Sequence, residues 1–247
     1  MFFGFDPIHI AIMVVGMILS LAAAGYVKLA FNRGKEVPLR SGRTGADIAR
    51  LILKHEGVDD VAVVEHQGFL SDHYDPTAKE LRLSPDVYHG QHASAAGVAA
   101  HEVGHALQHA QGDFTMWGRT ILVYPAHFGS MLAPLIILAG ILLGSAHQVA
   151  SGHHGLGYYL AVGGVFLFGI ASACSLIIVF NEFNASTRAR AALTNLGVTY
   201  PGEEDDTVRK VLLAAGLTYV AAAVVALMEL IYWAYQAGLL GGGRREE

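Results

Sequence analysis

Residues 97–106 read GVAAHEVGHA, and residues 101–105 of this stretch form the pattern HExxH. Side chains four positions apart lie on one face of an α-helix, so His101 and His105 can reach the same metal ion if the stretch is helical. Glu102 then lies beside that ion, where a carboxylate can take a proton from a water molecule. The pattern therefore requires a helix and predicts a zinc site with its own catalytic base.

The residues around the pattern favour such a helix. Residues 93–110 are rich in alanine and contain no proline, which is typical of a helix interior. The alternative is a chance match in a chain with 13 histidines. At this chain's own frequencies of His and Glu, about 0.03 chance matches to HExxH are expected. We therefore predict a helix over 93–110 and interpret the pattern as a metal site.

The composition indicates where this site lies. Hydrophobic residues make up 53% of the 247 residues and charged residues 15%, whereas soluble domains contain roughly 25% charged residues. Four apolar segments each have the length of about 20 residues that a membrane-spanning helix needs. They are 8–31, 121–146, 158–180 and 211–240. We predict a mainly α membrane protein with four transmembrane helices in the lipid bilayer.

Basic residues predict the orientation in the membrane. No Lys or Arg precedes the apolar run of 8–31, and Lys28, Arg33 and Lys35 lie at its end, which is typical of an uncleaved anchor. The segments after the first and third spans are rich in Lys and Arg, whereas 147–157 contains neither, so the basic segments are predicted to be cytoplasmic. Two arginines near the C-terminus oppose this orientation weakly. The prediction is a multi-pass protein of the cell (inner) membrane with its active site on the cytoplasmic side.

The predicted domains follow from these spans. Residues 1–31 form an N-terminal anchor, 32–118 a small α+β, zincin-like cytoplasmic metalloprotease domain, and 119–247 three further transmembrane helices, with 181–210 as a cytoplasmic loop. Before the HExxH helix, the cytoplasmic domain is predicted to contain a helix, a strand and a β-hairpin around a turn. These elements are the helix 44–55, the strand 61–64, the hairpin strands 68–74 and 80–83, and the turn 75–78.

A catalytic zinc ion needs a third protein ligand. The metzincin pattern places a Gly and a third His after HExxH, but Gln108 and Gln111 occupy those positions here, which excludes that class. His109 shares a helix face with His101 and lies about 12 Å from it along the axis, too far for one ion. His109 is therefore predicted to have a structural or supporting role.

Glu182 is the better candidate for the third ligand. It lies at the end of the third span, and the hairpin of spans two and three returns the chain to the face that holds the HExxH helix. A carboxylate there can complete a site of two histidines and one glutamate. A solvated Glu at the membrane interface is the alternative, which position alone leaves open.

Several longer stretches resemble a known family, the YugP-type membrane zinc metallopeptidases, which are gluzincins related more distantly to the HtpX and Ste24 proteases. The resemblance covers most of the chain. It rests on the stretches 72–76 (DHYDP), 81–84 (LRLS), 86–88 (DVY), 97–106 and 182–186 (EFNAS).

The resemblance implies a role for each site residue. It implies that His101, His105 and Glu182 are zinc ligands and that Glu102 is the general base. Two positions depart from the expected pattern: Asn184 and Ser186 stand where the family or its wider class has an acidic residue. The groups that orient the ligand imidazoles are therefore expected to be less charged here, or to come from elsewhere.

Together these features predict an integral-membrane, zinc-dependent endopeptidase that acts on a peptide or protein substrate. Glu102 takes a proton from water activated by Zn²⁺ and delivers it to the leaving amine. Substrate is predicted to add as a strand to the hairpin at 80–83. The donor that stabilises the transition state stays open among four candidates. They are Tyr74, His73, His109 and Arg188.

Two other classes of protein stay open. One is a catalytically silent, zinc-stabilised membrane scaffold, and the other is a transporter whose intramembrane Glu229 and histidines handle ions. Glu229 itself is read equally well as functional or as an interfacial residue. A net charge of −5 without a long basic run argues against a nucleic-acid partner. Five histidines are predicted to pack or face solvent rather than bind the metal. They are His9, His127, His147, His153 and His154.

Overall fold

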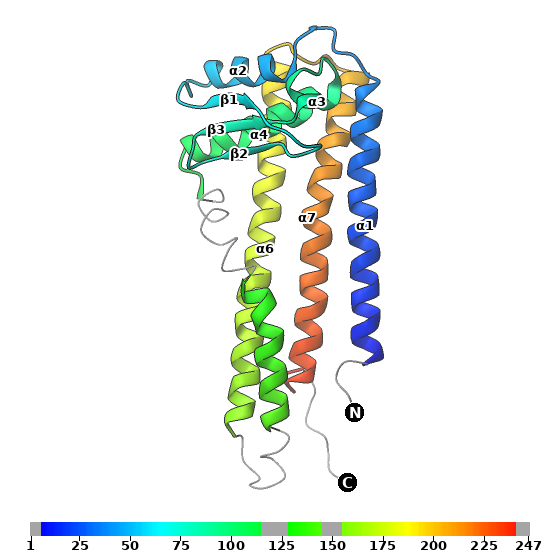
Figure 1. Ribbon diagram of the computed structural model, residues 1–247, viewed down its shortest axis with the longest axis vertical. Coiled ribbons are helices and arrows are strands. Elements are labelled where there is room, and N and C mark those ends of the chain that lie inside the picture. Colours follow the sequence, from blue (N-terminus) through cyan, green and yellow to red (C-terminus); the bar gives the residue numbers. More distant parts are fainter. Residues whose placement is uncertain (1–5, 115–127, 145–154, 241–247) are drawn as a thin grey trace. The chain divides into compact units, whose positions relative to one another are not determined.

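Three long helices dominate the computed structural model, which describes residues 6–114, 128–144 and 155–240 (Figure 1). They are α1 (Pro7–Lys35), α6 (Leu156–Asn195) and α7 (Glu203–Gln236). All three are long and apolar enough to cross a membrane. The expected second span, 121–146, falls partly outside the described residues, and its described part is the shorter apolar helix Phe128–Gly144. Three of the described helices, rather than the expected four, therefore qualify as spans.

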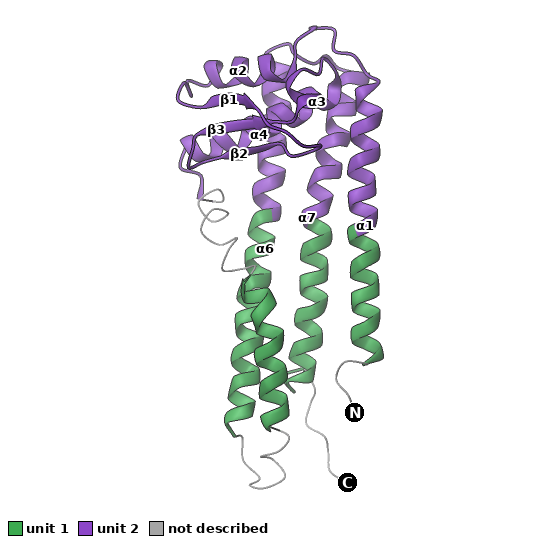
Figure 2. Ribbon diagram, viewed as in Figure 1, with its two compact units in different colours: residues 1–20, 118–178, 220–247 green, residues 21–117, 179–219 purple. Residues whose placement is uncertain are grey.

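The chain divides into two compact units (Figure 2). Unit 1 comprises residues 1–20, 118–178 and 220–247, and unit 2 comprises residues 21–117 and 179–219. The three long helices each contribute to both units, and unit 2 also holds the sheet and the shorter helices between residues 45 and 110. Unit 2 is thus larger than the predicted segment 32–118, because parts of all three long helices belong to it.

The segment 181–210 is mostly helical, although a loop was predicted there. Helix α6 continues to Asn195, and α7 begins at Glu203. The polar residues after the apolar run include good helix formers and no Gly or Pro before Gly197, so nothing in them stops the helix. Hydropathy marks where an apolar span ends, and this helix extends beyond that point.

Unit 2 contains the predicted short helix. Helix α2 (Gly45–His55) begins after Thr44, which forms a capping box with Asp47. The Thr44 hydroxyl accepts from the Asp47 backbone N–H, and the Asp47 carboxylate accepts from the Thr44 N–H, at 3.1 Å each. Hydrogen bonds from Thr44 lower the pKa of Asp47. The helix predicted over 44–55 is confirmed, and its start follows from this reciprocal cap.

A three-stranded sheet follows, in the order β1-β3-β2. Strands β2 (His73–Asp75) and β3 (Glu80–Leu83) pair antiparallel, which confirms the predicted hairpin. Strand β1 (Ala62–Glu65) pairs parallel with β3. The central strand β3 is therefore hydrogen-bonded on both sides, and the prediction that substrate adds to 80–83 is wrong. The edges of this sheet belong to β1 and β2.

The HExxH helix forms as predicted. Helix α4 (Ala93–Ala110) follows the single turn of α3 (Pro85–Tyr88) and is buried over most of its length. It packs in one apolar core with α2, β3 and the part of α6 near Leu193. A Cβ atom on Gly104 would lie 2.7 Å from the Ala185 carbonyl oxygen of α6. The glycine inside the motif therefore lets α4 and α6 approach closely.

Small residues also bring helices together in unit 1. A Cβ atom on Gly140 would lie 2.4 Å from the Ala161 nitrogen, and one on Gly164 would lie 3.1 Å from the Ile137 nitrogen. The helix Phe128–Gly144 therefore packs backbone against backbone on α6, a mode that is common between helices in membranes.

Candidate metal and catalytic site

Helices α4 and α6 bring His101, His105 and Glu182 together. Glu182 Oε2 lies 3.2 Å from His101 Nε2 and 3.6 Å from His105 Nε2. One donor atom from each residue lies within 4.8 Å of the others, and within the described ranges this is the only such group of three His, Cys, Asp or Glu residues. Their exposed fractions are 8%, 2% and 2%. Two imidazoles and a carboxylate are the donor set of many catalytic zinc sites, so the group could hold a metal ion and its chemistry suits zinc.

The sequence explains how the three residues meet. His101 and His105 are one helical turn apart on α4, so they share the face that packs on α6. Glu182 lies within α6, rather than in the predicted loop, three residues before Ala185, where the backbones approach at Gly104. Both helices are rigid elements, so the separation of the donor atoms depends on the α4–α6 contact.

Gln108 fixes the orientation of the His105 ring. This fully buried side chain donates from Nε2 to the Asn181 carbonyl oxygen at 3.1 Å and to Asn184 Oδ1 at 3.0 Å. Because a carbonyl oxygen can only accept, the amide oxygen of Gln108 must face His105 Nδ1, 2.9 Å away. Nδ1 therefore carries the proton, and Nε2 keeps a lone pair directed toward Glu182.

His101 has a neutral partner of its own. The Ser186 hydroxyl lies 3.2 Å from His101 Nδ1, so a proton on Nδ1 leaves the Nε2 lone pair toward Glu182. Asn184 and Ser186, which replace expected acidic residues, are thus the groups that support the two imidazoles, one through Gln108 and one directly. The expectation of a less charged surrounding agrees with these contacts.

Gln108 is a functional candidate that sequence reasoning missed. In the sequence, Gln108 was considered only as a residue that excludes the metzincin pattern. Its spacing of three residues from His105 places the two side chains on the same helix face, which was an available signal. Its partners on α6 could not be identified without the packing of the two helices.

Glu102 belongs to α4, and its side chain reaches the edge strand β2. Its Oε2 accepts the backbone N–H of Tyr74, on β2, at 3.0 Å. It lines the same cavity as His101 and Glu182, with 8% of the residue exposed. The carboxylate is therefore held beside the proposed metal ligands and not among them.

The four predicted candidates for a transition-state donor all make other hydrogen bonds. The Tyr74 hydroxyl and His109 Nδ1 are 2.8 Å apart, and burial raises the pKa of that hydroxyl. His73 Nδ1 lies 2.8 Å from the Ser71 carbonyl oxygen. Arg188 donates to Asn184, Gln111 and Asp113. His109 thus joins α4 to β2, in line with a supporting role, and the contacts single out none of the four.

Asp72 is a further acidic residue of the same cavity. Burial raises its pKa and the nearby Glu102 carboxylate adds to that rise, whereas hydrogen bonds from the Ser84 N–H and hydroxyl oppose it. These two bonds are 2.7 and 3.0 Å long. Ser84 directly follows β3. These bonds therefore anchor the loop before β2 to the end of β3.

The chain is similar in sequence to known proteins over most of its length. The family described as "Putative neutral zinc metallopeptidase" matches residues 9–238. A protein of Bacillus subtilis (strain 168) named "Putative membrane protease YugP" is 43% identical over 224 residues, which cover 91% of this chain and 94% of that protein. No solved structure matches the chain.

Proposed function

The chain belongs to the neutral zinc metallopeptidase family, and from this premise we propose that it is an integral-membrane, zinc-dependent endopeptidase. His101, His105 and Glu182 hold the zinc ion, and Glu102 is the general base. The observation that carries the proposal is the convergence of three buried donor atoms within 4.8 Å of one another. Two of the three residues, His101 and Glu182, line the cavity that Glu102 also lines.

The residues divide the chemistry between them. Zinc at this site would supply a Lewis acid that activates water and polarises the peptide carbonyl. Glu102 accepts a proton from the attacking water and returns it to the leaving amine as the peptide bond breaks. Gln108 keeps the His105 imidazole in the tautomer that binds a metal, and the Ser186 hydroxyl can accept the Nδ1 proton of His101 in the same tautomer. Burial of all three ligands limits the contact of their side chains with bulk water.

The peptide is proposed to lie along the edge strand β2, which replaces the predicted location on β3. Tyr74, on β2, donates its backbone N–H to Glu102 at 3.0 Å, so the edge of this strand faces the proposed base. Because the Tyr74 N–H already donates to Glu102, a peptide that adds to this edge would pair with the Tyr74 carbonyl oxygen or displace that bond. Such a peptide would pass next to Glu102.

The fold supports placement in a membrane. The three candidate spans expose large apolar side chains, such as Met17, Phe166 and Ile231, which are 56%, 72% and 61% exposed. Lipid would cover such a surface, whereas soluble proteins rarely expose large apolar patches. Most of the Lys and Arg residues of the chain lie in unit 2, and this bias supports its location on the cytoplasmic side of the cell (inner) membrane.

Single cysteines test this orientation. In a Cys174→Ala background, Leu156→Cys lies at the start of α6 in unit 1 and Lys54→Cys on the surface of unit 2, and both positions are exposed. We expect an impermeant thiol reagent to label position 156 in intact cells and position 54 only in permeabilised cells. The reverse pattern would overturn the orientation.

Metal removal and restoration tests the enzyme. The purified full-length protein in detergent is expected to cleave casein, to lose that activity with the chelator 1,10-phenanthroline and to regain it with about one equivalent of zinc. A protein that binds one zinc ion per chain yet cleaves neither casein nor any peptide is the silent scaffold instead. Activity that persists without metal would contradict the zinc mechanism.

A further inference from the structure

A cavity of ≈ 220 Å³ opens beside the proposed metal ligands. His101, Glu102 and Glu182 form part of its wall, and the remaining wall is largely aliphatic and aromatic. All of its lining residues belong to unit 2. The mechanism uses only the polar part of this wall, so the apolar part needs a separate explanation.

The apolar wall comes largely from the helices that could cross a membrane. Val27 and Phe31 of α1 line the cavity, as does the stretch of α7 from Val211 to Tyr219. Eight residues of helix correspond to about 12 Å along the axis. Along the chain, the apolar run of α1 ends at Phe31 and that of α7 begins at Val211. The cavity therefore extends from the catalytic residues along the ends of two candidate spans.

A loop before β2 closes another side of the cavity. Leu70 lines it and packs on the core of unit 2, although its φ of 53° is unfavourable for a leucine. Such strain persists where surrounding contacts enforce it, and it is frequent at functional sites. The neighbouring Phe69 is 54% exposed and lies edge-on to Phe31, with ring centroids 5.7 Å apart. The loop thus adds apolar surface next to the end of α1.

We propose that this cavity receives a large apolar side chain of the substrate and that the substrate is an extended, apolar segment of a membrane-anchored polypeptide, which reaches the site from the bilayer. The inference rests on the proposed peptidase function. It adds the class of peptide that is cleaved and the side from which that peptide arrives.

The size of the cavity sets the form of the substrate. A cavity of about 150 Å³ lined by apolar residues accommodates benzene, so ≈ 220 Å³ accommodates one large apolar side chain. A helix with its side chains is about 10–12 Å across and does not fit. A membrane-anchored substrate must therefore present an unwound stretch, which also suits addition to β2.

Peptide preference tests the proposed class of substrate. Three quenched fluorescent peptides of one sequence carry Leu, Gly or Asp at two central positions, and the zinc-loaded full-length protein in detergent cleaves them. We expect kcat/KM for the Leu peptide to exceed that for the Gly peptide about tenfold or more, because an apolar pocket discriminates by the size of the apolar group. The Asp peptide is expected to be the poorest substrate.

Filling the cavity locates this preference. Ala215 lines the cavity, and Ala215→Phe is expected to lower the Leu/Gly ratio of kcat/KM about tenfold or more. Ala222→Phe is the matched control, since Ala222 lies on the same helix, is exposed and does not line the cavity. It should keep the ratio of the parent. Leu70→Ala enlarges the cavity and should raise kcat/KM for a fourth peptide, with Trp at the same two positions, relative to the Leu peptide.

The outcomes separate the two proposals. If the parent cleaves all three peptides equally, or if neither Ala215→Phe nor Leu70→Ala alters the preference, the inference is wrong and the peptidase function stands. If no peptide and no casein is cleaved by the zinc-loaded protein, the proposed function is wrong and the inference falls with it.

Access from the bilayer has its own test. Two reporter proteins in the same vesicles each carry one transmembrane helix and the Leu sequence, either directly after the helix or behind a long Gly/Ser linker. We expect the adjacent sequence to be cleaved faster, because only that sequence lies at the depth of the span ends. Equal or faster cleavage of the distant sequence would overturn access from the bilayer.

Discussion

Two pairs of His and Glu side chains lie at almost the same separation in the two units. In unit 2, His101 Nε2 is 3.2 Å from Glu182 Oε2, and in unit 1, His9 Nε2 is 3.3 Å from Glu229 Oε2. The first pair joins α4 to α6, whereas the second joins α1 to α7. The chemistry around each pair differs.

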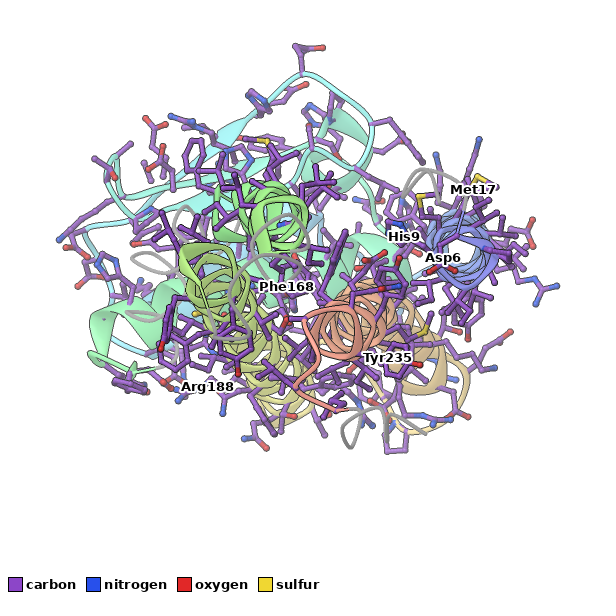
Figure 3. The ribbon with its side chains drawn as sticks, turned by 90° about the horizontal axis from the view of Figure 1, so that it is seen from below. Asp6, His9, Met17, Phe168, Arg188 and Tyr235 are labelled. Atoms are coloured by element: carbon purple, nitrogen blue, oxygen red, sulfur yellow. The ribbon has the colours of Figure 1, made fainter. Side chains whose placement is uncertain are left out.

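The pair in unit 2 has a second imidazole beside it, and neutral side chains contact both rings at Nδ1. The His9 ring instead stacks on Tyr232, with ring centroids 4.6 Å apart, and the Tyr232 hydroxyl donates to Asp6. Figure 3 shows His9 on α1 and Asp6 just before that helix begins. The side chains of His9 and Glu229 are 22% and 18% exposed, whereas that of Glu182 is 2% exposed.

A short His–Glu distance is therefore insufficient for a metal site. Zinc needs three converging donors, and unit 2 brings one donor atom from each of three residues within 4.8 Å of one another. The pair in unit 1 links the beginning of α1 to the last part of α7 through the His9–Glu229 contact and ring contacts. The role of Glu229 stays a prediction, and its visible contact is the one with His9.

Removal of each glutamate gives the largest expected contrast. Glu182→Ala removes one of three ligands and should weaken zinc binding by more than the roughly 10- to 100-fold that is typical of losing an outer hydrogen-bond partner. Glu229→Ala is the matched control in the other pair and should keep about one zinc ion per chain. Metal analysis of the purified variants checks both. Zinc retained by Glu182→Ala and lost by His109→Ala would refute the proposed ligand set.

Loss of the Gln108 amide should have a smaller effect. Gln108→Leu keeps a similar volume but removes the partner of His105 Nδ1, so zinc affinity is expected to fall roughly 10- to 100-fold. Gln236→Leu is the matched control, because Gln236 donates to Asp6 in unit 1. Competition with a fluorescent zinc chelator measures both affinities. Equal affinities for the two variants would show that the amide does not support the site.

The smallest expected change concerns the contact between α4 and α6. Gly104→Ala places a Cβ atom 2.7 Å from the Ala185 carbonyl oxygen, and such overpacking typically costs about 1–3 kcal/mol. At Gly97 on the same helix, a Cβ atom would meet Val208 at an ordinary 3.5 Å, so Gly97→Ala should be neutral or stabilise by up to about 1 kcal/mol. Thermal denaturation in detergent compares the two. Equal stability would contradict the close approach at Gly104.

The sequence predicted the local elements well. Helix α4 has the bounds expected from its alanine-rich surroundings, Thr44 and Asp47 set the start of α2, and the turn at 75–78 produces the hairpin. In each case the signal lies within a few residues of the element. The structure also brings Glu182 next to His101 and His105, and its role as the third ligand stays a prediction.

What could not be predicted depends on contacts between distant segments. The parallel pairing of β1 with β3 makes β3 central, and no local pattern shows which strand lies at an edge. The continuation of α6 beyond the apolar run places Glu182 on a helix, because hydropathy reports the span and not the helix end. Gln108 acquires its role only where α4 crosses α6 and its amide meets Asn181 and Asn184.

The proposed division of labour between base and ligands is tested most directly by Glu102→Gln. The substitution preserves size and polarity but removes the proton acceptor. We expect this variant to keep about one zinc ion per chain and to lose peptidase activity by about 100-fold or more. Metal content and cleavage of casein are measured on the same preparation, beside the parent protein. Cleavage as fast as that of the parent, or loss of the zinc ion, would contradict the proposed role of Glu102.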